Sequence, residues 1–289
     1  MIRLYLMGMK GFVALRELNK KFIGEIEHVT IGRDANVQND YSKEIRETCK
    51  IHNLPNSYKG KSATMETCKT TASFAIGWRW LINTSSLLIV FHDSLLPKHR
   101  GFNPLVTALI NRDPKIGVTA LKATSDFDAG PICGQLSTEV NYPIKIQVAI
   151  EKISLLYAQL LNQTIAKHLG NCLEFTPQNE EQATYSLWRD EEDYRIDWRK
   201  SSEEIAHFIK ALGFPYKGAS MKLDQKILRV FDATSEPDIK IENRQPGKVI
   251  FKKNGALFVV CGYGLLKIQN LFHEDEPFDF SKKFRLRFK

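Results

Sequence analysis

Three short apolar runs in the first third of the chain constrain its fold most strongly. They are "IRLYLM" at 2–7, "ASFAIG" at 72–77 and "LLIVFH" at 87–92, and none alternates strictly between apolar and polar residues. Continuous apolar runs of this length are typical of strands that are covered on both faces in a parallel sheet. We therefore expect an α/β fold wound around a mainly parallel sheet.

The residues after the first run predict a helix. Gly8 and Gly11 are followed by "FVALRELNKKF" (12–22), in which apolar residues recur near helical spacing. The two glycines do not have the G-x-G-x-x-G spacing that cradles a pyrophosphate, which disfavours a dinucleotide-dependent oxidoreductase. A long amphipathic helix is predicted over 144–168, and we expect the first domain to cover 1–170.

The remainder of the chain changes character. Residues 171–200 are polar and aromatic without clear periodicity, which indicates an extended segment that crosses the surface between two domains. A short helix is predicted over 201–212. Apolar runs then alternate with turn signals, and Asn254–Gly255 between two such runs predicts a β-hairpin. We expect residues 201–289 to form a small β domain.

The cysteines give no sign of a disulfide framework or a metal site. Their number is odd, they are widely scattered, and no pair has C-x-x-C or zinc-finger spacing. We expect reduced thiols, mostly buried, and no bound metal. The five are Cys49, Cys68, Cys133, Cys172 and Cys261.

Hydropathy and charge bear on location and partners. No stretch approaches the roughly 20 apolar residues of a membrane span, and "MIRLYLMGMKGF" lacks a signal-peptide cleavage site. These features predict a cytoplasmic protein without a membrane partner. The formal net charge of +8 suits a phosphate-bearing partner, but no block of like charges stands out, so an ordinary solvated surface explains it as well.

The segment "FHDSLLPKHRGFNP" (91–104) carries the strongest candidate for chemistry. His92 falls at the predicted carboxyl end of a parallel strand, the edge where open α/β sheets bind ligands. Arg100–Gly101 follows, and Asp128 lies further on in "SDFDAGPI". An isolated histidine is often structural. An imidazole and a carboxylate at neighbouring strand ends can instead share general acid–base work.

The order and spacing of these residues resemble the formyltransferases that use N10-formyltetrahydrofolate. That family's pattern is Asn-x-His, then Ser-Leu-Leu-Pro and Arg-Gly, and later Asp-x-Gly. It is matched by His92, by 94–97, by 100–101 and by 128–130. The resemblance implies a Rossmann-like catalytic domain, a small OB-like C-terminal domain, N10-formyltetrahydrofolate as co-substrate and no metal.

One position departs from the family pattern. Val90 stands where the family has asparagine, a donor to the formyl oxygen. Asn103 is our candidate replacement, although it could equally form a turn before Pro104 or contact a sugar. The resemblance assigns His92 to stabilising the oxyanion, and Asp128 to accepting the amine proton or holding His92 in the correct protonation state.

The resemblance also suggests residues that bind the two substrates. The "GWRWLI" turn (77–82) corresponds to the turn that lines the folate pocket, although such a turn is commonly just packing. We expect folate contacts from Trp78, Arg79, Trp80, Leu81 and Asp126, and acceptor contacts from Ser94, Arg100, Gly101, Trp188, Arg189, Tyr216 and Lys217.

The identity of the acceptor depends on which members of the family this chain resembles more. Methionyl-tRNA formyltransferases generally carry a basic insertion after the second strand, where this chain reads "IGRDANVQNDYSKEI". "GFPYKGA" and "YSLWRDEEDYRIDW" are more similar to nucleotide-sugar N-formyltransferases. We expect a nucleotide-linked amino sugar as acceptor and no nucleic-acid partner, with a homodimer left open. The alternatives are methionyl-tRNA, another amine, or an impaired relative that only binds a nucleotide or RNA.

Overall fold

The computed structural model describes residues 1–35, 37–60, 69–281, 283 and 285–289. The described chain divides into two compact units. The first contains Met1–Ala108, Asp113–Val140 and Val148–Trp188, and the second contains Leu109–Arg112, Asn141–Gln147 and Arg189–Lys289.

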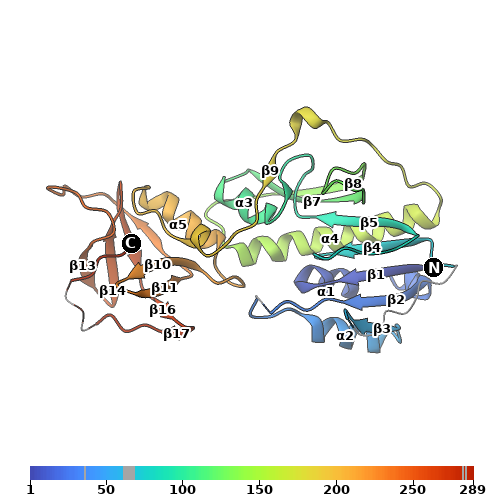
Figure 1. Ribbon diagram of the computed structural model, residues 1–289, viewed down its shortest axis with the longest axis horizontal. Coiled ribbons are helices and arrows are strands. Elements are labelled where there is room, and N and C mark those ends of the chain that lie inside the picture. The colour runs from blue at the N-terminus through green and yellow to red at the C-terminus, as the bar shows by residue number, and fades with distance from the viewer. Residues whose placement is uncertain (36, 61–68, 282, 284) are drawn as a thin grey trace. The chain divides into compact units, whose positions relative to one another are not determined.

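A seven-stranded sheet forms the centre of the first unit (Figure 1), in the order β3-β2-β1-β4-β5-β7-β8. The first five strands in that order are mutually parallel, β7 runs antiparallel to β5, and β8 runs antiparallel to β7. The expected α/β fold with a mainly parallel sheet is therefore confirmed. The strands are β1 (Ile2–Leu6), β2 (Ile26–Ile31), β3 (Asn56–Tyr58), β4 (Ala72–Ile76), β5 (Leu87–His92), β7 (Lys115–Lys122) and β8 (Ile132–Glu139).

Burial along the strands follows their place in the sheet. All five residues of β4 are buried, as are four of the five in β1, because helices or neighbouring chain cover both faces of these central strands. The edge strand β8 instead alternates between more and less exposed residues over "ICGQLSTE". That alternation shows a strand with one solvated face.

Four helices accompany the sheet. They are α1 (Gly8–Arg16), α2 (Ser42–Ile51), α3 (Pro104–Ile110) and α4 (Ile146–Leu169). Helix α1 begins at Gly8, earlier than the sequence suggested. It ends at Arg16, and Asn19 then caps a separate 3-10 helix, η1 (Lys20–Glu25), by accepting a hydrogen bond from the Lys21 amide. Helix α4 lies over the sheet in Figure 1 and buries Ile153, Tyr157 and Ile165 completely.

The described residues of the second unit form one α-helix, one short 3-10 helix (Glu192–Tyr194) and two antiparallel sheets. Helix α5 (Ser202–Ala211) starts with a reciprocal capping box between Ser201 and Glu204. The predicted hairpin is confirmed and joins β13 (Val249–Lys253) to β14 (Ala256–Val260), with φ of 50° at Asn254 and 73° at Gly255. The sheets contain β10 (Ala219–Leu223), β11 (Lys226–Val230), β16 (Phe272–His273) and β17 (Glu276–Pro277), and β12 (Thr234–Glu236), β15 (Leu265–Ile268), β14 (Ala256–Val260) and β13 (Val249–Lys253).

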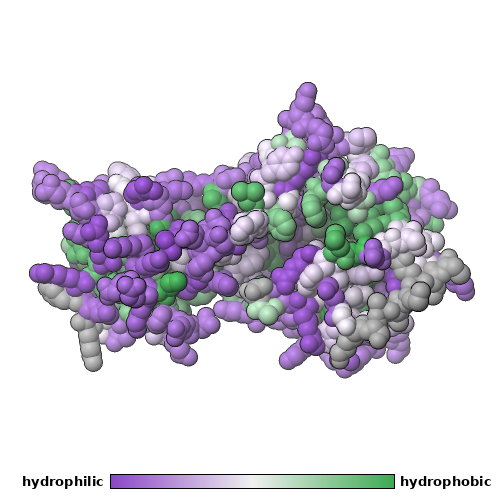
Figure 2. Space-filling model, viewed as in Figure 1, coloured by the Kyte–Doolittle hydropathy of each residue, from purple (hydrophilic) through white to green (hydrophobic). Residues whose placement is uncertain are grey.

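Hydrophilic side chains cover most of the second unit on the face shown in Figure 2. No helix among the described residues is long and apolar enough to cross a bilayer. Cys49, Cys133 and Cys261 are buried free thiols, and Cys172 is free but exposed, whereas Cys68 lies outside the described residues. Burial raises the pKa of Cys49 and of Cys261 to about 12.

Candidate active site

His92 lies at the carboxyl end of β5, where it pairs with Thr119 of β7. Its side chain is only 10% exposed, and each ring nitrogen lies close to an oxygen atom of the protein. Nε2 lies 2.8 Å from the backbone carbonyl oxygen of His99. Because a carbonyl can only accept, this contact assigns a proton to Nε2. The other nitrogen, Nδ1, lies 3.4 Å from Oδ1 of Asp128 and is available to exchange a proton.

Asp128 reaches His92 by a route that the sequence did not indicate. We expected the carboxylate at a neighbouring strand end, but β7 runs antiparallel to β5 and ends at Lys122, which pairs with Ile89, away from His92. The connection from β7 to β8 therefore has to return along β5 to bring Asp128 beside His92. Asp128 adopts a left-handed backbone conformation, with φ of 55°, within this connection.

Two neighbouring segments hold Asp128 in place. The backbone amide of Gly101 donates a 2.9 Å hydrogen bond to Oδ2, which leaves Oδ1 to face the imidazole. The side-chain amide of Gln178 donates to the carbonyls of Asp128 and Gly130, at 2.7 Å each. Both the carboxylate and the backbone of Asp128 are thus fixed from outside its own loop.

Arg100 is one of the predicted acceptor contacts, but the structure gives its guanidinium other partners. Only 3% of the residue is exposed. It donates to both carboxylate oxygens of Glu180, at 2.7 Å each, and to Oε1 of Gln178, at 2.9 and 3.1 Å. Arg100 therefore orients the Gln178 amide that supports Asp128.

The backbone at position 101 requires a glycine. Residues Arg100–Gly101 form β6, which pairs with β9 (Tyr185–Ser186). The φ of Gly101 is 98°, and a Cβ there would lie 2.6 Å from the carbonyl oxygen of Ser186. Only glycine permits this close approach of the two backbones.

Ser94, another predicted acceptor contact, is buried within its own loop. Its hydroxyl donates a 2.6 Å hydrogen bond to the carbonyl of Lys98, and its carbonyl accepts from the Thr119 hydroxyl at 2.6 Å. Thr119 also accepts hydrogen bonds from the Leu96 amide and from the side chain of Gln135. The Ser-Leu-Leu-Pro turn is therefore fastened to β7 and β8.

Two positions bear on the family asparagine that this chain lacks: the half-buried Val90, which replaces it, and the exposed Asn103, our candidate donor. Val90 precedes His92 by two residues on β5, so the two side chains share one face of the strand. Asn103 is exposed and immediately precedes α3 with a φ of 50°, and its carbonyl accepts the first helical hydrogen bond from Thr107. That place fits a turn-forming residue, and the role of Asn103 as a donor stays a prediction.

The turn after β4 forms an aromatic cluster at the carboxyl edge of the sheet. The Trp78 and Trp80 rings meet edge to face at 5.0 Å. Trp80 also packs beneath the ammonium of Lys59 and the guanidinium of Arg79, and Arg79 pairs with Asp34 at 3.1 Å. The indole Nε1 of Trp78 is buried and has no hydrogen-bond acceptor among the described residues.

The remaining predicted contacts lie in four separate segments. Leu81 is 92% exposed, and Asp126 is exposed in the loop that carries Asp128. Trp188 is 62% exposed, and Arg189 follows it in sequence with a buried Nε that lacks a described partner. Between α5 and β10 stand the half-buried Tyr216 and the exposed Lys217.

The sequence analysis did not identify several residues that surround His92 and Asp128. Gln178 and Glu180 belong to the polar segment after α4, where no periodicity marks them. Lys10 and Asp93 form a largely buried ion pair directly beside His92. None of these positions carries a local sequence signal, because each acquires its partner only through folding.

The chain thus combines a histidine–carboxylate pair at the end of a central strand with a unit of antiparallel sheets. Residues 79–153 match the family model described as formyl transferase, and residues 189–282 match the formyl transferase C-terminal domain. These two matches together span more than half of the chain. The protein belongs to the formyl transferase family.

Relatives of known sequence or structure agree with this membership. A methionyl-tRNA formyltransferase of Lactococcus lactis subsp. lactis is 30% identical over 188 residues, which are 65% of this chain and 58% of the relative. The chain thus spans about three fifths of the length of the curated relatives it matches.

Two solved structures share the fold at low sequence identity. An N-formyltransferase from Helicobacter canadensis, in complex with folinic acid and dTDP-3-aminofucose, has a TM-score of 0.70 at 15% identity, covering 94% of this chain and 99% of its own. A variant of HypX from Aquifex aeolicus has a TM-score of 0.65 at 18% identity, covering 95% of this chain and 44% of its own.

Proposed function

We propose that the protein transfers the formyl group of N10-formyltetrahydrofolate to the amine of a nucleotide-linked amino sugar. The observation that carries the proposal is the contact between His92 Nδ1 and Asp128 Oδ1 at 3.4 Å. An imidazole and a carboxylate that is fixed by two other segments are suited to share the proton that an attacking amine releases.

The protein's own groups divide this work as follows. The His99 carbonyl accepts a hydrogen bond from Nε2, so Nδ1 is the ring nitrogen through which His92 and Asp128 share a proton. Asp128 then stabilises the imidazolium that results. Gly101 keeps the second carboxylate oxygen occupied, which prevents the carboxylate from rotating away. Asn103 is the candidate donor to the oxygen of the formyl group.

The turn at 77–82 has features that fit the folate. A flat, partly polar heterocycle requires a slot with apolar walls and a few directed polar groups. Trp78 offers an unsatisfied indole N–H, and Leu81 offers an exposed apolar side chain. Trp78, Arg79, Trp80, Leu81 and Asp126 would hold the folate, which supplies the formyl group when bound.

Two considerations support an amino sugar as acceptor. The Helicobacter canadensis enzyme that shares this fold was solved with dTDP-3-aminofucose, and its chain is matched along almost its entire length. Trp188 and Lys217 are exposed aromatic and basic side chains of the kind that bind a nucleotide. Arg100, being buried against Glu180, fits the role of a positioning residue better than that of an acceptor contact.

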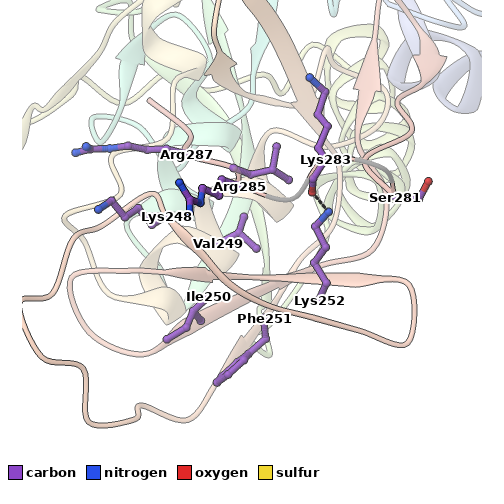
Figure 3. A pocket seen from close by; sticks show the side chains of 10 residues that line it. Lys248, Val249, Ile250, Phe251, Lys252, Ser281, Lys283, Arg285 and Arg287 are labelled. Carbon is purple, nitrogen blue, oxygen red and sulfur yellow. Dashed lines mark hydrogen bonds between the residues drawn. The ribbon is translucent and has the colours of Figure 1, made fainter.

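Methionyl-tRNA is the second candidate, favoured by the curated relatives and by one surface feature. A hollow of about 650 Å³ in the second unit lies between β13 and the described residues 281, 283 and 285–287 (Figure 3). Its described lining contains five basic side chains and no acidic one, which suits a phosphate backbone. They are Lys248, Lys252, Lys283, Arg285 and Arg287.

The experiment that tests the proposal compares acceptors directly. The purified protein is incubated with N10-formyltetrahydrofolate and, in separate reactions, with UDP- and dTDP-linked amino sugars and with methionyl-tRNA. We expect formylation of an amino sugar, detected as a mass gain of the nucleotide sugar. Formylation of methionyl-tRNA alone would replace the proposed acceptor. Absence of transfer to every acceptor, in protein that binds folate, would contradict the catalytic proposal.

A further inference from the structure

A second charged cluster lies directly behind His92. Asp93 follows it at the end of β5, and its two carboxylate oxygens have separate partners. Oδ2 accepts from the ammonium of Lys10 in α1, and Oδ1 accepts from the hydroxyl of Tyr157 in α4. The side chains of Lys10 and Asp93 are only 17% and 15% exposed, and Tyr157 is fully buried.

Tyr157 contacts the chain on both sides of His92. Its hydroxyl also lies 3.2 Å from the backbone carbonyl of Phe91, so a single hydroxyl group bridges the residues before and after the histidine. Burial, followed by the nearby Asp93 carboxylate, raises the pKa of Tyr157 well above its ordinary value. The hydroxyl therefore remains a donor throughout the physiological pH range.

The charge on Asp93 is maintained by the same partners. Burial alone would raise the pKa of Asp93, but the Lys10 ammonium and the hydrogen bonds from Lys10 and Tyr157 outweigh it and lower that pKa. A buried ion pair adds little net stability compared with apolar side chains of the same size. The orientation that the cluster imposes therefore accounts for it better than the stability that it supplies.

We propose that Asp93 is a positioning residue for His92: by binding Lys10 and Tyr157 it joins the end of β5 to α1 and α4, and so fixes the imidazole in the direction of Asp128. The inference rests on the proposed function only for its kinetic readout. Displacing a reacting group by about 1 Å can lower a rate by about a hundredfold. Fixing the strand end on both sides of His92 limits such displacement.

The first test separates positioning from stability by removing the two charges singly and together. Asp93→Asn strands the Lys10 ammonium and should lower the unfolding midpoint. The double variant Lys10→Met/Asp93→Asn leaves no unpaired charge and should regain most of that midpoint. If Asp93 positions His92, kcat of the double variant stays about tenfold to a hundredfold below that of the unmodified protein. Recovery of kcat together with stability would overturn the proposal.

The second test does not depend on turnover. The seven histidines are labelled with ¹⁵N, and the ring signals of His92 are assigned from their loss in His92→Gln. The double variant should shift the His92 signals and leave the others in place. Unchanged His92 signals would contradict a positioning role. If the unmodified protein transfers no formyl group, the proposed function fails, while these spectra still decide whether Asp93 orients His92.

The chain offers a matched control at the other edge of the same sheet. Arg3 and Glu27 form an ion pair at 3.3 Å near the amino ends of β1 and β2, with side chains 7% and 11% exposed. Glu27→Gln should therefore lower stability in the same manner as Asp93→Asn. Glu27→Gln should leave both kcat and the His92 signals unchanged. If the two variants changed kcat and the His92 signals equally, the loss of any buried charge would explain the effect, and Asp93 would have no specific positioning role.

Discussion

The side-chain amide of Gln178 donates a 2.7 Å hydrogen bond to the backbone carbonyl of Asp128, fifty residues away in sequence. The same nitrogen also donates to Gly130, and Arg100 holds the amide oxygen. Gln178 thus holds the backbone of Asp128 in place and forms no hydrogen bond with its carboxylate. The position of the candidate base partner depends on a segment that lies outside the catalytic motifs.

Replacing Gln178 by alanine should impair this support. The loop would lose two hydrogen bonds to carbonyls, at a cost of about 1–2 kcal/mol in unfolding free energy. Asp128 would then deviate from His92, and we expect kcat to fall about tenfold. Gln182→Ala, at an exposed position in η2 (Glu180–Gln182), is the control and should leave kcat unchanged. Equal kcat values for the two variants would refute the role of Gln178.

His92→Ala and Asp128→Asn should each lower kcat by about tenfold to a hundredfold, the range expected when an acid–base partner is lost. Neither side chain belongs to the apolar core, so circular dichroism should report an unchanged fold. Steady-state kinetics with the accepted amine provide the measurement. Near-normal turnover by either variant would remove that residue from the mechanism.

The unsatisfied N–H of Trp78 should matter to the folate and not to the fold. Trp78→Phe keeps an aromatic ring against Tyr5 and Trp80 while deleting the donor. We expect weaker folate binding by about fivefold to tenfold, from one lost hydrogen bond, and unchanged binding of the nucleotide sugar, measured by calorimetry. Trp198 in the second unit also has a buried Nε1 with no hydrogen-bond partner among the described residues, so Trp198→Phe is the matched control. Equal losses for both ligands would argue against a folate contact.

Asn103 requires a variant that respects its backbone. Alanine is strained at a φ of 50°, so Asn103→Gly is the cleaner change. If the side chain donates to the transition state, kcat and kcat/KM should fall together, by about a hundredfold. A raised KM at constant kcat would instead indicate a sugar contact. Unchanged kinetics would leave Asn103 as a turn residue only.

Asp113 should make stability depend on pH in the acid range. Burial tends to raise its pKa, but hydrogen bonds and attraction from Lys98 and His99 outweigh burial and lower it below the ordinary value of 3.8. Its contribution is therefore present above about pH 4 and is lost as the pH falls through the lowered value. The unfolding midpoint of Asp113→Asn should fall less steeply over that range.

The control for this titration is Asp224→Asn. Asp224 is exposed in the turn between β10 and β11 and forms no ion pair with a described residue. Thermal unfolding at a series of pH values compares the two variants with the unmodified protein. A slope for Asp113→Asn as steep as that for Asp224→Asn would contradict the assignment.

The sequence predicted the strand that carries His92, because a continuous apolar run that ends at a polar turn is typical of a buried strand reaching the edge of its sheet. It could not predict the direction of β7, since a buried antiparallel strand has the same apolar pattern as a parallel one. Arg100 beside a glycine resembled a ligand contact. Its partner Glu180 is eighty residues away, and only folding reveals that the guanidinium is occupied. Lys10 and Asp93 were overlooked for the same reason.

The pairing of Gly101 with Ser186 also limits how the chain can be divided. A fragment that ends with α4 would contain His92 and Asp128 but would lack Gln178, Glu180 and the β9 backbone that fasten their loops. Such a fragment would retain the motif and lose its geometry. The smallest piece able to present the pair correctly therefore extends through Ser186, and recombination between relatives should succeed only at junctions beyond that residue.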